Sequence, residues 1–453
     1  MMRPLVLGAI GNLAARLAVC LALGVRHPGL LLGLMLVGVG VVTPALGNSL
    51  PQCLADLRAQ SPKNRVSTAD FDRLTANVRI LERVITSRAN QAEVVDLWWD
   101  YVPRMVDDRR VREGREVAAR WDEAMAAVER RYGVDRSIFT AIWGIETNYG
   151  ATQSSLPLLD VWVTRACTEQ RPLWRANVYA SLRLLRDGTV RQEEFVGSWG
   201  GAFGLTQFIP TSYEEFGVDG DGDGRADLVN SVPDALASTA NHLVSRTRWV
   251  PGLPPAIEVR VPPALTRGVP PTDETWRSND VRAISQWSRA GVTAASNQPL
   301  PGNSDARASL FYPAGADGPA FLVTDNFDAL LAYNRATKYA LSVALLAQRV
   351  AGAERTLERP WPTDDPGLGR DGIRELQELL IARGYEIGAA DGIPGPRTRE
   401  AVRAEQRRLG LPEDGRTGER ILRALRGASE APRPSSDARR DFQSPALADC
   451  SAA

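Results

Sequence analysis

A single carboxylate stands in the apolar run IFTAIWGIETNYG, residues 138–150. At helical spacing from Phe139, the same helix face carries Ile142 and Trp143 and then Glu146. An inward-facing carboxylate is poorly solvated, so we expect the pKa of Glu146 to be raised, as a general acid requires near neutral pH. The alternative is a structural glutamate paired with one of the many arginines, because ion pairs also perturb pKa values.

A second stretch, Gly197–Gly217, reads GSWGGAFGLTQFIPTSYEEFG. Its glycines allow the backbone to approach another group closely. Ser198 and Gln207 are polar side chains that could hydrogen-bond a sugar or its acetamido group. The alternative is a tight turn before a helix capped by Thr211 or Ser212.

Composition excludes several other chemistries. The 453-residue chain has two histidines, His27 and His242, so a multi-histidine zinc site cannot be built, and a Ser-His-Asp or Cys-His enzyme would depend on His242 alone. Carboxylates are therefore the expected acid and base groups. Lys and Arg together number 54, as do Asp and Glu, so bulk charge gives no reason to expect a nucleic-acid partner.

The elements that must position these residues are mostly helical. Asp135 can cap a helix that begins at Arg136. Apolar periodicity predicts three more helices, and alternation predicts a strand and a hairpin. The helices are expected at 115–134, 175–188 and 330–352, the strand at 255–263 and the hairpin at 308–326. We therefore predict a mainly α, catalytic-size domain with a small β insertion.

The N-terminal segment, residues 1–47, is typical of a leader. Its apolar run ends at Ala45 and Gly47, which offer a cleavage site before Asn48. We expect export to the periplasm, with an uncleaved membrane anchor as the alternative. In that oxidising compartment Cys53 and Cys167 are expected to form a disulfide, and the alternative is two unpaired buried thiols.

Four motifs together resemble the membrane-bound lytic murein transglycosylase B family (glycoside hydrolase family 103). They are AIWGIETNYG, GGAFGLTQFIPTSY, VDGDGDGRADLVNSVPDALASTANHL and YNRATKYALSV, in that order. The resemblance covers roughly residues 53–353 and implies a lysozyme-like catalytic domain at 48–353 without an organic cofactor.

The C-terminal segment, residues 368–427, resembles a three-helix peptidoglycan-binding domain. An Asp-Gly pair precedes a predicted helix start at two places, which indicates a short internal repeat. A Pro/Gly-rich linker is predicted at 354–367, and a disordered tail at 428–453. The residues at the family's motif positions are Gln377, Asp391, Gly392, Gly395, Thr398, Gln406, Asp414 and Gly415.

The resemblance implies cleavage of the β-1,4 bond between N-acetylmuramic acid and N-acetylglucosamine without added water. The muramic acid C6 hydroxyl closes a 1,6-anhydro ring, and Glu146 serves as acid and then base. The implied substrate contacts are Ser198, Gln207, Tyr333, Asn334, Tyr339 and, as a departure from the family's aromatic residue, His242. For the tyrosines the alternative is simple helix packing.

The run DGDGDGRADLVN suggests a cation site. Asp219, Asp221 and Asp223 occupy positions 1, 3 and 5 of an EF-hand-like loop, although position 12 is Asn230 rather than glutamate. The resemblance implies that Asp234 and the Arg225 carbonyl complete a structural Ca²⁺ site. The alternative is a solvated acidic turn.

Two other functions remain open from sequence. A hydrolytic muramidase could use Glu146 as acid and admit water, and a non-catalytic scaffold could bind the cell wall without cleaving it. We expect peptidoglycan glycan strands as the main partner and cell-wall synthesis or division proteins as further partners. The membrane would be contacted only through an uncleaved leader.

Overall fold

The computed structural model describes residues 49–86, 96–152, 154–169, 171–271, 274–300 and 305–428. The predicted leader at 1–47 lies outside these residues, and so does the predicted tail at 428–453 apart from Ala428, which ends the last helix. Within the described ranges, every helix is too short or too polar to cross a membrane.

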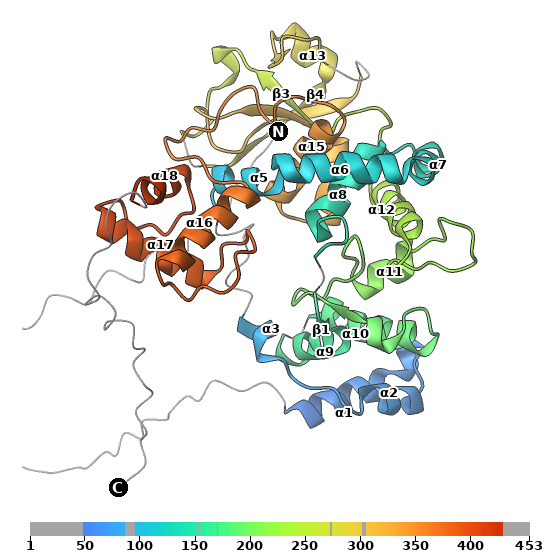
Figure 1. Cartoon of the computed structure of the whole chain (residues 1–453). Helices are drawn as coiled ribbons and strands as arrows, with labels where there is room; N and C mark the ends of the chain where they lie inside the picture. Colours follow the sequence, from blue (N-terminus) through green and yellow to red (C-terminus); the bar gives the residue numbers. More distant parts are fainter. Residues whose placement is uncertain are drawn as a thin grey trace, which may run out of the picture. The chain divides into compact units, whose positions relative to one another are not determined.

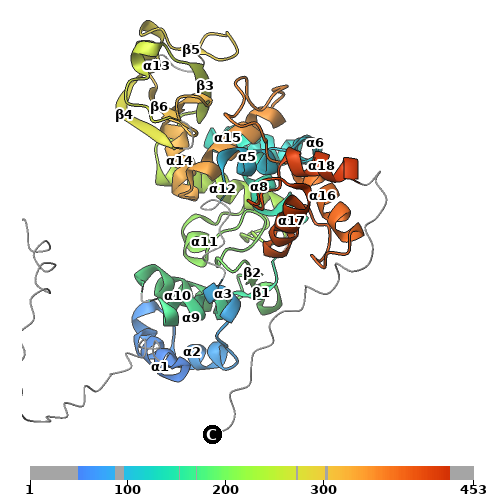
Figure 2. The ribbon, with the colours of Figure 1, turned by 90° about the vertical axis from the view of Figure 1, so that its left-hand side faces the viewer.

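An N-terminal group of helices is closed by a disulfide. It contains α1 (Leu50–Gln60), α2 (Thr68–Thr75), α3 (Glu82–Thr86), α9 (Leu158–Thr168) and α10 (Pro172–Arg186), with the 3₁₀ turn η1 (Pro62–Asn64). Figures 1 and 2 both show α1 and α2 beside α9 and α10. Cys53 of α1 and Cys167 of α9 are bonded across 114 residues of chain, as the sequence analysis predicted. The bond ties the first helix to the core of this group, where Leu57 and Val163 are fully buried.

The main core is a second helical group built around α8 (Arg136–Thr147). Helix α8 packs against α6, α7, α12 and α15, so helices surround it on several sides. Its residues from Ser137 to Gly144 are all buried, which explains why this segment is apolar on almost every face. The other members are α5 (Trp98–Met105), α6 (Asp108–Arg120), α7 (Asp122–Tyr132), α12 (Val232–Arg246), α14 (Asp325–Tyr333) and α15 (Thr337–Val350).

Two helices predicted as continuous are each divided in two. The segment 115–134 breaks at Trp121, whose backbone leaves the helical region between α6 and α7. The segment 330–352 breaks at Asn334, which is extended (φ −137°, ψ 122°) and whose side-chain oxygen accepts the N–H of Ala336. An asparagine side chain that bonds the nearby backbone competes with the helix, and periodicity alone does not reveal this.

The β insertion is a five-stranded antiparallel sheet in the order β4-β6-β7-β3-β5. The expected strand and hairpin are present as β3 (Ala256–Arg260) and β6 (Arg307–Tyr312) with β7 (Ala320–Thr324). Sequence analysis missed β4 (Trp276–Ala283), whose polar residues and bulge hide the alternation. The smaller elements are β5 (Thr293–Ala294), α13 (Ile284–Arg289), η4 (Pro263–Leu265), η3 (Gln192–Glu194) and α11 (Pro210–Phe216). A second sheet consists of two short strands, β1 (Leu156–Pro157) and β2 (Val196–Gly197).

The C-terminal domain has three helices, α16 (Arg370–Ala382), α17 (Pro396–Leu409) and α18 (Glu419–Ala428), around their own apolar core. The repeated Asp-Gly pairs of the sequence are each held by a glutamine through the same two hydrogen bonds, and we call each such arrangement a clamp. The Gln377 side chain accepts the N–H of Gly392 at 2.7 Å and donates to the Asp391 carboxylate at 3.0 Å. In the same way Gln406 accepts from Gly415 at 2.9 Å and donates to Asp414 at 2.7 Å.

Candidate active site

Glu146 lies in the last turn of α8. The helix begins as predicted, because the Asp135 carboxylate accepts the N–H of Ser137 at 2.8 Å. Unlike its buried neighbours on the preceding turns, Glu146 is half-buried. Glu146 therefore follows a buried apolar run of the helix and is itself partly accessible.

Two stacked tyrosines lie beside this carboxylate. The rings of Tyr333 and Tyr339 are nearly parallel, with centroids 6.4 Å apart. Burial is the main reason that the pKa of each phenol is raised, and the nearby charge of Glu146 raises both further. The break at Asn334 brings the two rings together, since it separates the helix that ends at Tyr333 from the helix that carries Tyr339.

The turn after α8 has an unusual backbone. Asn148, Tyr149 and Gly150 follow one another with φ of 51°, 57° and 84°, in the left-handed region that non-glycine residues seldom adopt. The Tyr149 phenol packs edge-on against Trp143 and donates to the Arg110 carbonyl at 2.9 Å. Such strain persists only where the surroundings hold it, and it is common near functional sites. Sequence analysis did not single out Tyr149.

Tyr149 needs two glycines in order to fit. A Cβ on Gly144 would lie 2.6 Å from the Tyr149 ring, and a Cβ on Gly114 would lie 2.4 Å from its hydroxyl. Both distances are below any ordinary carbon contact. The phenol therefore occupies space that α8 and α6 leave open only because these two positions lack side chains, and it fixes the end of the helix that bears Glu146.

The Gly-rich stretch is bonded directly to this site. Thr147 donates its hydroxyl to the Leu205 carbonyl at 2.6 Å, and Tyr333 donates to the Thr206 carbonyl at 2.5 Å. Gln207 adopts a φ of 56°, and its amide donates to Gly204 at 2.9 Å. Consecutive residues of the stretch are thus held against both Glu146-bearing α8 and the tyrosine pair.

Ser198 and Asn334 bond locally. The Ser198 hydroxyl accepts the N–H of Ala202 at 3.3 Å, closing the first turn of the Gly-rich stretch. Gly201 in this turn lies on the Trp162 ring, and the Trp162 indole donates to the Gly201 carbonyl at 3.1 Å. Both Ser198 and Asn334 are half-buried, so their remaining hydrogen-bonding capacity is accessible.

His242 requires a correction, because the structure does not place it on an open surface. Its side chain is 5% exposed and packs behind Tyr333, with ring centroids 4.8 Å apart. Phe216 and Phe208 contact it from other sides. Burial, with the charge of Arg246 as a smaller cause, lowers the pKa of His242 to about 4. A neutral imidazole therefore fills the aromatic core that supports Tyr333.

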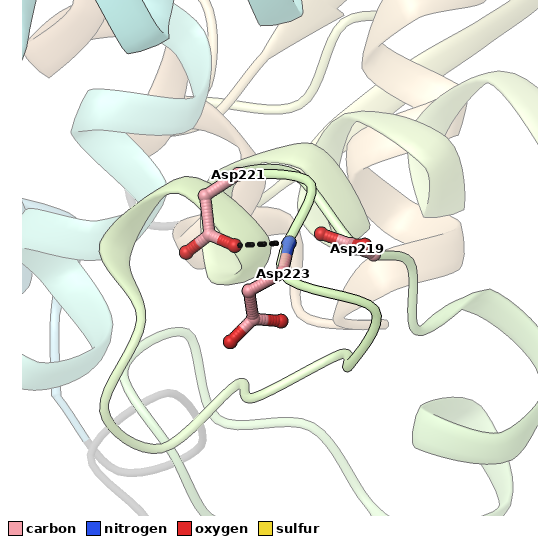
Figure 3. Close-up of side chains that lie close together, drawn as sticks. All are labelled: Asp219, Asp221 and Asp223. Atoms are coloured by element: carbon pink, nitrogen blue, oxygen red, sulfur yellow. Dashed lines mark hydrogen bonds between the residues drawn. The ribbon is translucent and has the colours of Figure 1, made fainter.

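The aspartate loop, residues Asp219–Asp227, gathers the three predicted carboxylates. Asp219, Asp221 and Asp223 each offer an oxygen, and these atoms all lie within 4.8 Å of one another (Figure 3). Hydrogen bonds from the N–H groups of Gly224 and Gly222 lower the pKa of Asp219, which keeps it charged. Adjacent carboxylates repel unless a cation screens them, and oxygen ligands suit a hard divalent ion. The donor set therefore fits Ca²⁺.

Asp234 is bonded to the backbone of the aspartate loop, and its role as a Ca²⁺ ligand, which the resemblance implied, stays a prediction. It is fully buried, and its carboxylate accepts N–H groups of Gly220 at 2.7 Å, Asp221 at 3.3 Å and Asp227 at 2.6 Å. Its oxygens are not among those that cluster with the three carboxylates of the loop. Asp234 therefore fastens the aspartate loop to the start of α12 from the inside. Arg225 is exposed, and its N–H donates to the Asp223 side chain.

Comparison with known proteins identifies the class to which this fold and site belong. Residues 49–348 match the Transglycosylase SLT domain family, and residues 369–425 match a peptidoglycan binding domain family. The chain therefore belongs to the Transglycosylase SLT domain family and is a lytic transglycosylase.

Particular relatives agree with this assignment. The chain is 28% identical to the membrane-bound lytic murein transglycosylase B of Escherichia coli K12 over 305 residues, 63% of this chain and 80% of that protein. The solved structure of SltB3 from Pseudomonas aeruginosa in complex with NAG-NAM-pentapeptide is 38% identical, covers 84% of this chain and all of its own, and has a TM-score of 0.64. The Escherichia coli lytic transglycosylase SLT35 in complex with calcium is 27% identical, covers 68% of this chain and 94% of its own, and has a TM-score of 0.54.

Proposed function

We propose that this lytic transglycosylase cleaves the β-1,4 bond between N-acetylmuramic acid and N-acetylglucosamine in peptidoglycan, with Glu146 as its acid and base. The observation that carries the proposal is that the half-buried Glu146 lies beside the Tyr333–Tyr339 stack. Ordinary glycosidases use a pair of carboxylates. A single carboxyl group that acts first as acid and then as base suffices when the substrate supplies its own nucleophile.

In the first step, Glu146 gives its proton to the glycosidic oxygen as the bond from that oxygen to the muramic acid C1 breaks. The departing sugar leaves as a neutral alcohol. Positive charge grows at C1, and the neighbouring acetamido oxygen of the substrate stabilises it. The step requires Glu146 in its protonated form.

In the second step, ionised Glu146 takes the proton of the C6 hydroxyl while that oxygen forms a bond to C1. The product is the 1,6-anhydro ring, and the acid returns to its starting state without any net consumption of water. Fixing the carboxylate matters, because the same group must reach two different oxygens in turn.

The groove residues orient the glycan. We assign this role to Ser198, Gln207 and Asn334, whose accessible polar groups suit hydroxyl and acetamido groups, and to Tyr333, which offers a ring face. Tyr339 is 1% exposed, so it acts on Glu146 rather than on an open surface. His242 supports Tyr333 from behind.

A structural Ca²⁺ ion is assigned to the aspartate loop, with Asp219, Asp221 and Asp223 as carboxylate ligands and the Arg225 carbonyl as a further oxygen. The bound calcium of the related SLT35 supports this assignment. The ion would stabilise the loop and has no part in the chemistry. The carbonyl of Leu228, one residue after the loop, accepts the N–H of Leu205 at 3.0 Å, so order in the loop extends to the Gly-rich stretch.

We further assign this enzyme to the periplasm, reached through the leader at 1–47. The C-terminal three-helix domain binds glycan strands, and proteins of cell-wall synthesis or division are its candidate protein partners. The SltB3 complex with NAG-NAM-pentapeptide supports a glycan with peptide stems as the substrate class.

Mass spectrometry of the soluble products from purified peptidoglycan sacculi tests the proposal. Muropeptides that end in 1,6-anhydro-N-acetylmuramic acid are expected. Products one water heavier would identify a hydrolytic muramidase, and retained binding without release would identify a scaffold. The matching Glu146→Gln variant shows whether any release depends on the proposed acid.

A further inference from the structure

Arg370, the first residue of α16, connects the C-terminal domain to three groups of the catalytic domain. Its Nε donates to the Asp107 carboxylate at 3.0 Å, and one terminal nitrogen lies 3.4 Å from Glu113. The other terminal nitrogen donates to the side-chain oxygen of Asn148. The Arg370 side chain is 14% exposed, so these bonds form with little competition from water.

The contact with Asn148 is the informative one. Asn148 is the C-cap of α8, two residues after Glu146, and its N–H donates to the Gly144 carbonyl at 3.0 Å. Its φ of 51° lies in the strained left-handed region. A guanidinium that holds the Asn148 side chain thereby restrains the backbone that ends the catalytic helix.

The opposite end of the same guanidinium is equally well fixed. Asp107 is the N-cap of α6, where its carboxylate accepts the N–H of Arg110 at 2.9 Å, and it is buried to 8% exposure. Arg370 therefore bridges the start of α6 and the end of α8. The Tyr149 phenol ties the same two helices together from inside, since it donates to the carbonyl of Arg110.

We propose that Arg370 is a positioning residue for catalysis, through which the peptidoglycan-binding domain restrains the turn that follows Glu146. The inference rests on the proposed role of Glu146. It gives the C-terminal domain a second task besides holding glycan: while docked, it keeps the acid aligned with the scissile bond. Sequence alone could not suggest this contact, which joins residues 222 positions apart.

Two other arginines of the same domain provide matched controls. Arg399 donates to Asp96 at 2.8 Å, and Arg416 donates to Asp100 at 2.8 Å. Both pairs connect the C-terminal domain to residues at or before α5, and neither involves the end of α8. Asp96 also keeps its buried partner Arg104 when Arg399 is changed. Arg399→Gln therefore removes one ionic contact between the domains and leaves the Arg370–Asn148 bond in place.

The test uses the full chain and three variants: Arg370→Gln, Arg399→Gln and Asn148→Gly. Asn148→Gly deletes the amide that Arg370 holds but tolerates the positive φ. Initial rates on a soluble, uncrosslinked glycan of four sugars give kcat and KM separately. Hydrogen exchange of the amides at residues 147–150 reports order at the turn independently of activity.

We expect Arg370→Gln to lower kcat about tenfold with little change in KM, since small misplacement of a catalytic group is costly. Exchange at 147–150 should become faster in this variant and stay unchanged in Arg399→Gln. The double variant Arg370→Gln/Asn148→Gly should be no worse than the more impaired single variant, because each single variant already removes the Arg370–Asn148 bond.

The proposal is overturned by a folded Arg370→Gln variant with unchanged kcat, or by equal losses in Arg399→Gln, which would indicate docking alone. Additive losses in the double variant would also overturn it. A wild-type protein that releases no anhydro product would instead refute the proposed function, and with it the catalytic role of Arg370. This outcome can be told apart from failure of the Arg370 proposal alone, because here the wild-type protein itself is inactive.

Discussion

The turn after α8 and the aspartate loop are both tight backbone reversals near the Gly-rich stretch, but they are stabilised differently. The turn has φ of 51° and 57° at Asn148 and Tyr149, which carry side chains. The aspartate loop uses positive φ only at Gly222 and Gly224, and nothing lies within 4 Å of a Cβ placed at either position. The first reversal is strained and packed, whereas the second is relaxed and open.

The stabilising forces differ accordingly. The turn is held by a buried phenol and by an arginine from another domain. The aspartate loop is held by carboxylates that accept backbone N–H groups, and three of them remain close enough to repel. Packing therefore fixes the backbone beside the acid, while electrostatics fixes the more distant loop, where an ion can adjust it.

Glu146→Gln is expected to have the largest effect on the rate of cleavage. It removes the proposed acid and leaves the backbone of both reversals unchanged. Loss of a general acid costs up to about 10⁴-fold in rate, and the amide cannot give up a proton. Release of anhydro muropeptides should fall to background while the thermal unfolding midpoint stays close to that of the wild type. Undiminished release would remove Glu146 from the mechanism.

Gly144→Ala should break the packed turn. The new methyl group would meet the Tyr149 ring at 2.6 Å, and overpacking of this kind costs about 3 kcal/mol at the upper end of its range. Urea unfolding should show this loss, and activity should fall with it because Tyr149 must move. Gly427→Ala is the control, since a Cβ there meets nothing within 4 Å. Equal stability of the two variants would show that the turn tolerates repacking.

Calcium should act mainly on the aspartate loop. At an ion concentration 100 times its dissociation constant, binding to the folded state adds about 2.7 kcal/mol. A chelator should lower the unfolding midpoint of the wild type, and Asp219→Asn should abolish most of the response. Hydrogen exchange should slow at residues 219–227 on adding calcium but not at 147–150. A midpoint insensitive to calcium would leave the loop as a solvated acidic turn.

Replacing His242 should have a smaller effect, which is a change in how the free energy of unfolding depends on pH. Its folded pKa of about 4 lies below the unfolded value of 6.5, so the unfolded chain binds the proton more readily. This contribution to stability is complete above pH 6.5 and declines as the pH falls towards 4, by about 2 kcal/mol between pH 7 and pH 5. The stability of His242→Phe should therefore fall less over that interval. Parallel pH profiles would contradict the buried neutral imidazole.

Local signals in the sequence predicted much of the fold. Asp135 marked the start of α8, alternation marked the β6–β7 hairpin, and the compartment argument paired Cys53 with Cys167. Each depends on neighbouring residues or on one pairing rule. The mainly α class followed from the same periodicity.

Other features depend on interactions that are distant in sequence. The residues on both sides of Asn334 keep the apolar period of a helix, so the sequence predicted a continuous helix there. The break that the structure has at Asn334 brings Tyr333 and Tyr339 together. His242 appeared to be a groove residue until Phe216 and Tyr333 were seen to enclose it. Asp234 was predicted as a ligand, and the sequence did not reveal that its carboxylate also accepts three backbone N–H groups. Tertiary packing, which the one-dimensional pattern does not contain, decided each case.

The paired clamps of the C-terminal domain also bear on its ancestry. Gln377 and Gln406 lie in successive helices and grip equivalent Asp-Gly pairs with the same two hydrogen bonds. Repeated units of one helix and one loop cannot bury their apolar faces singly, but they can do so when they adjoin. The domain has the pattern expected from duplication of a helix–loop unit within one gene, with α18 completing the core that the two copies leave open.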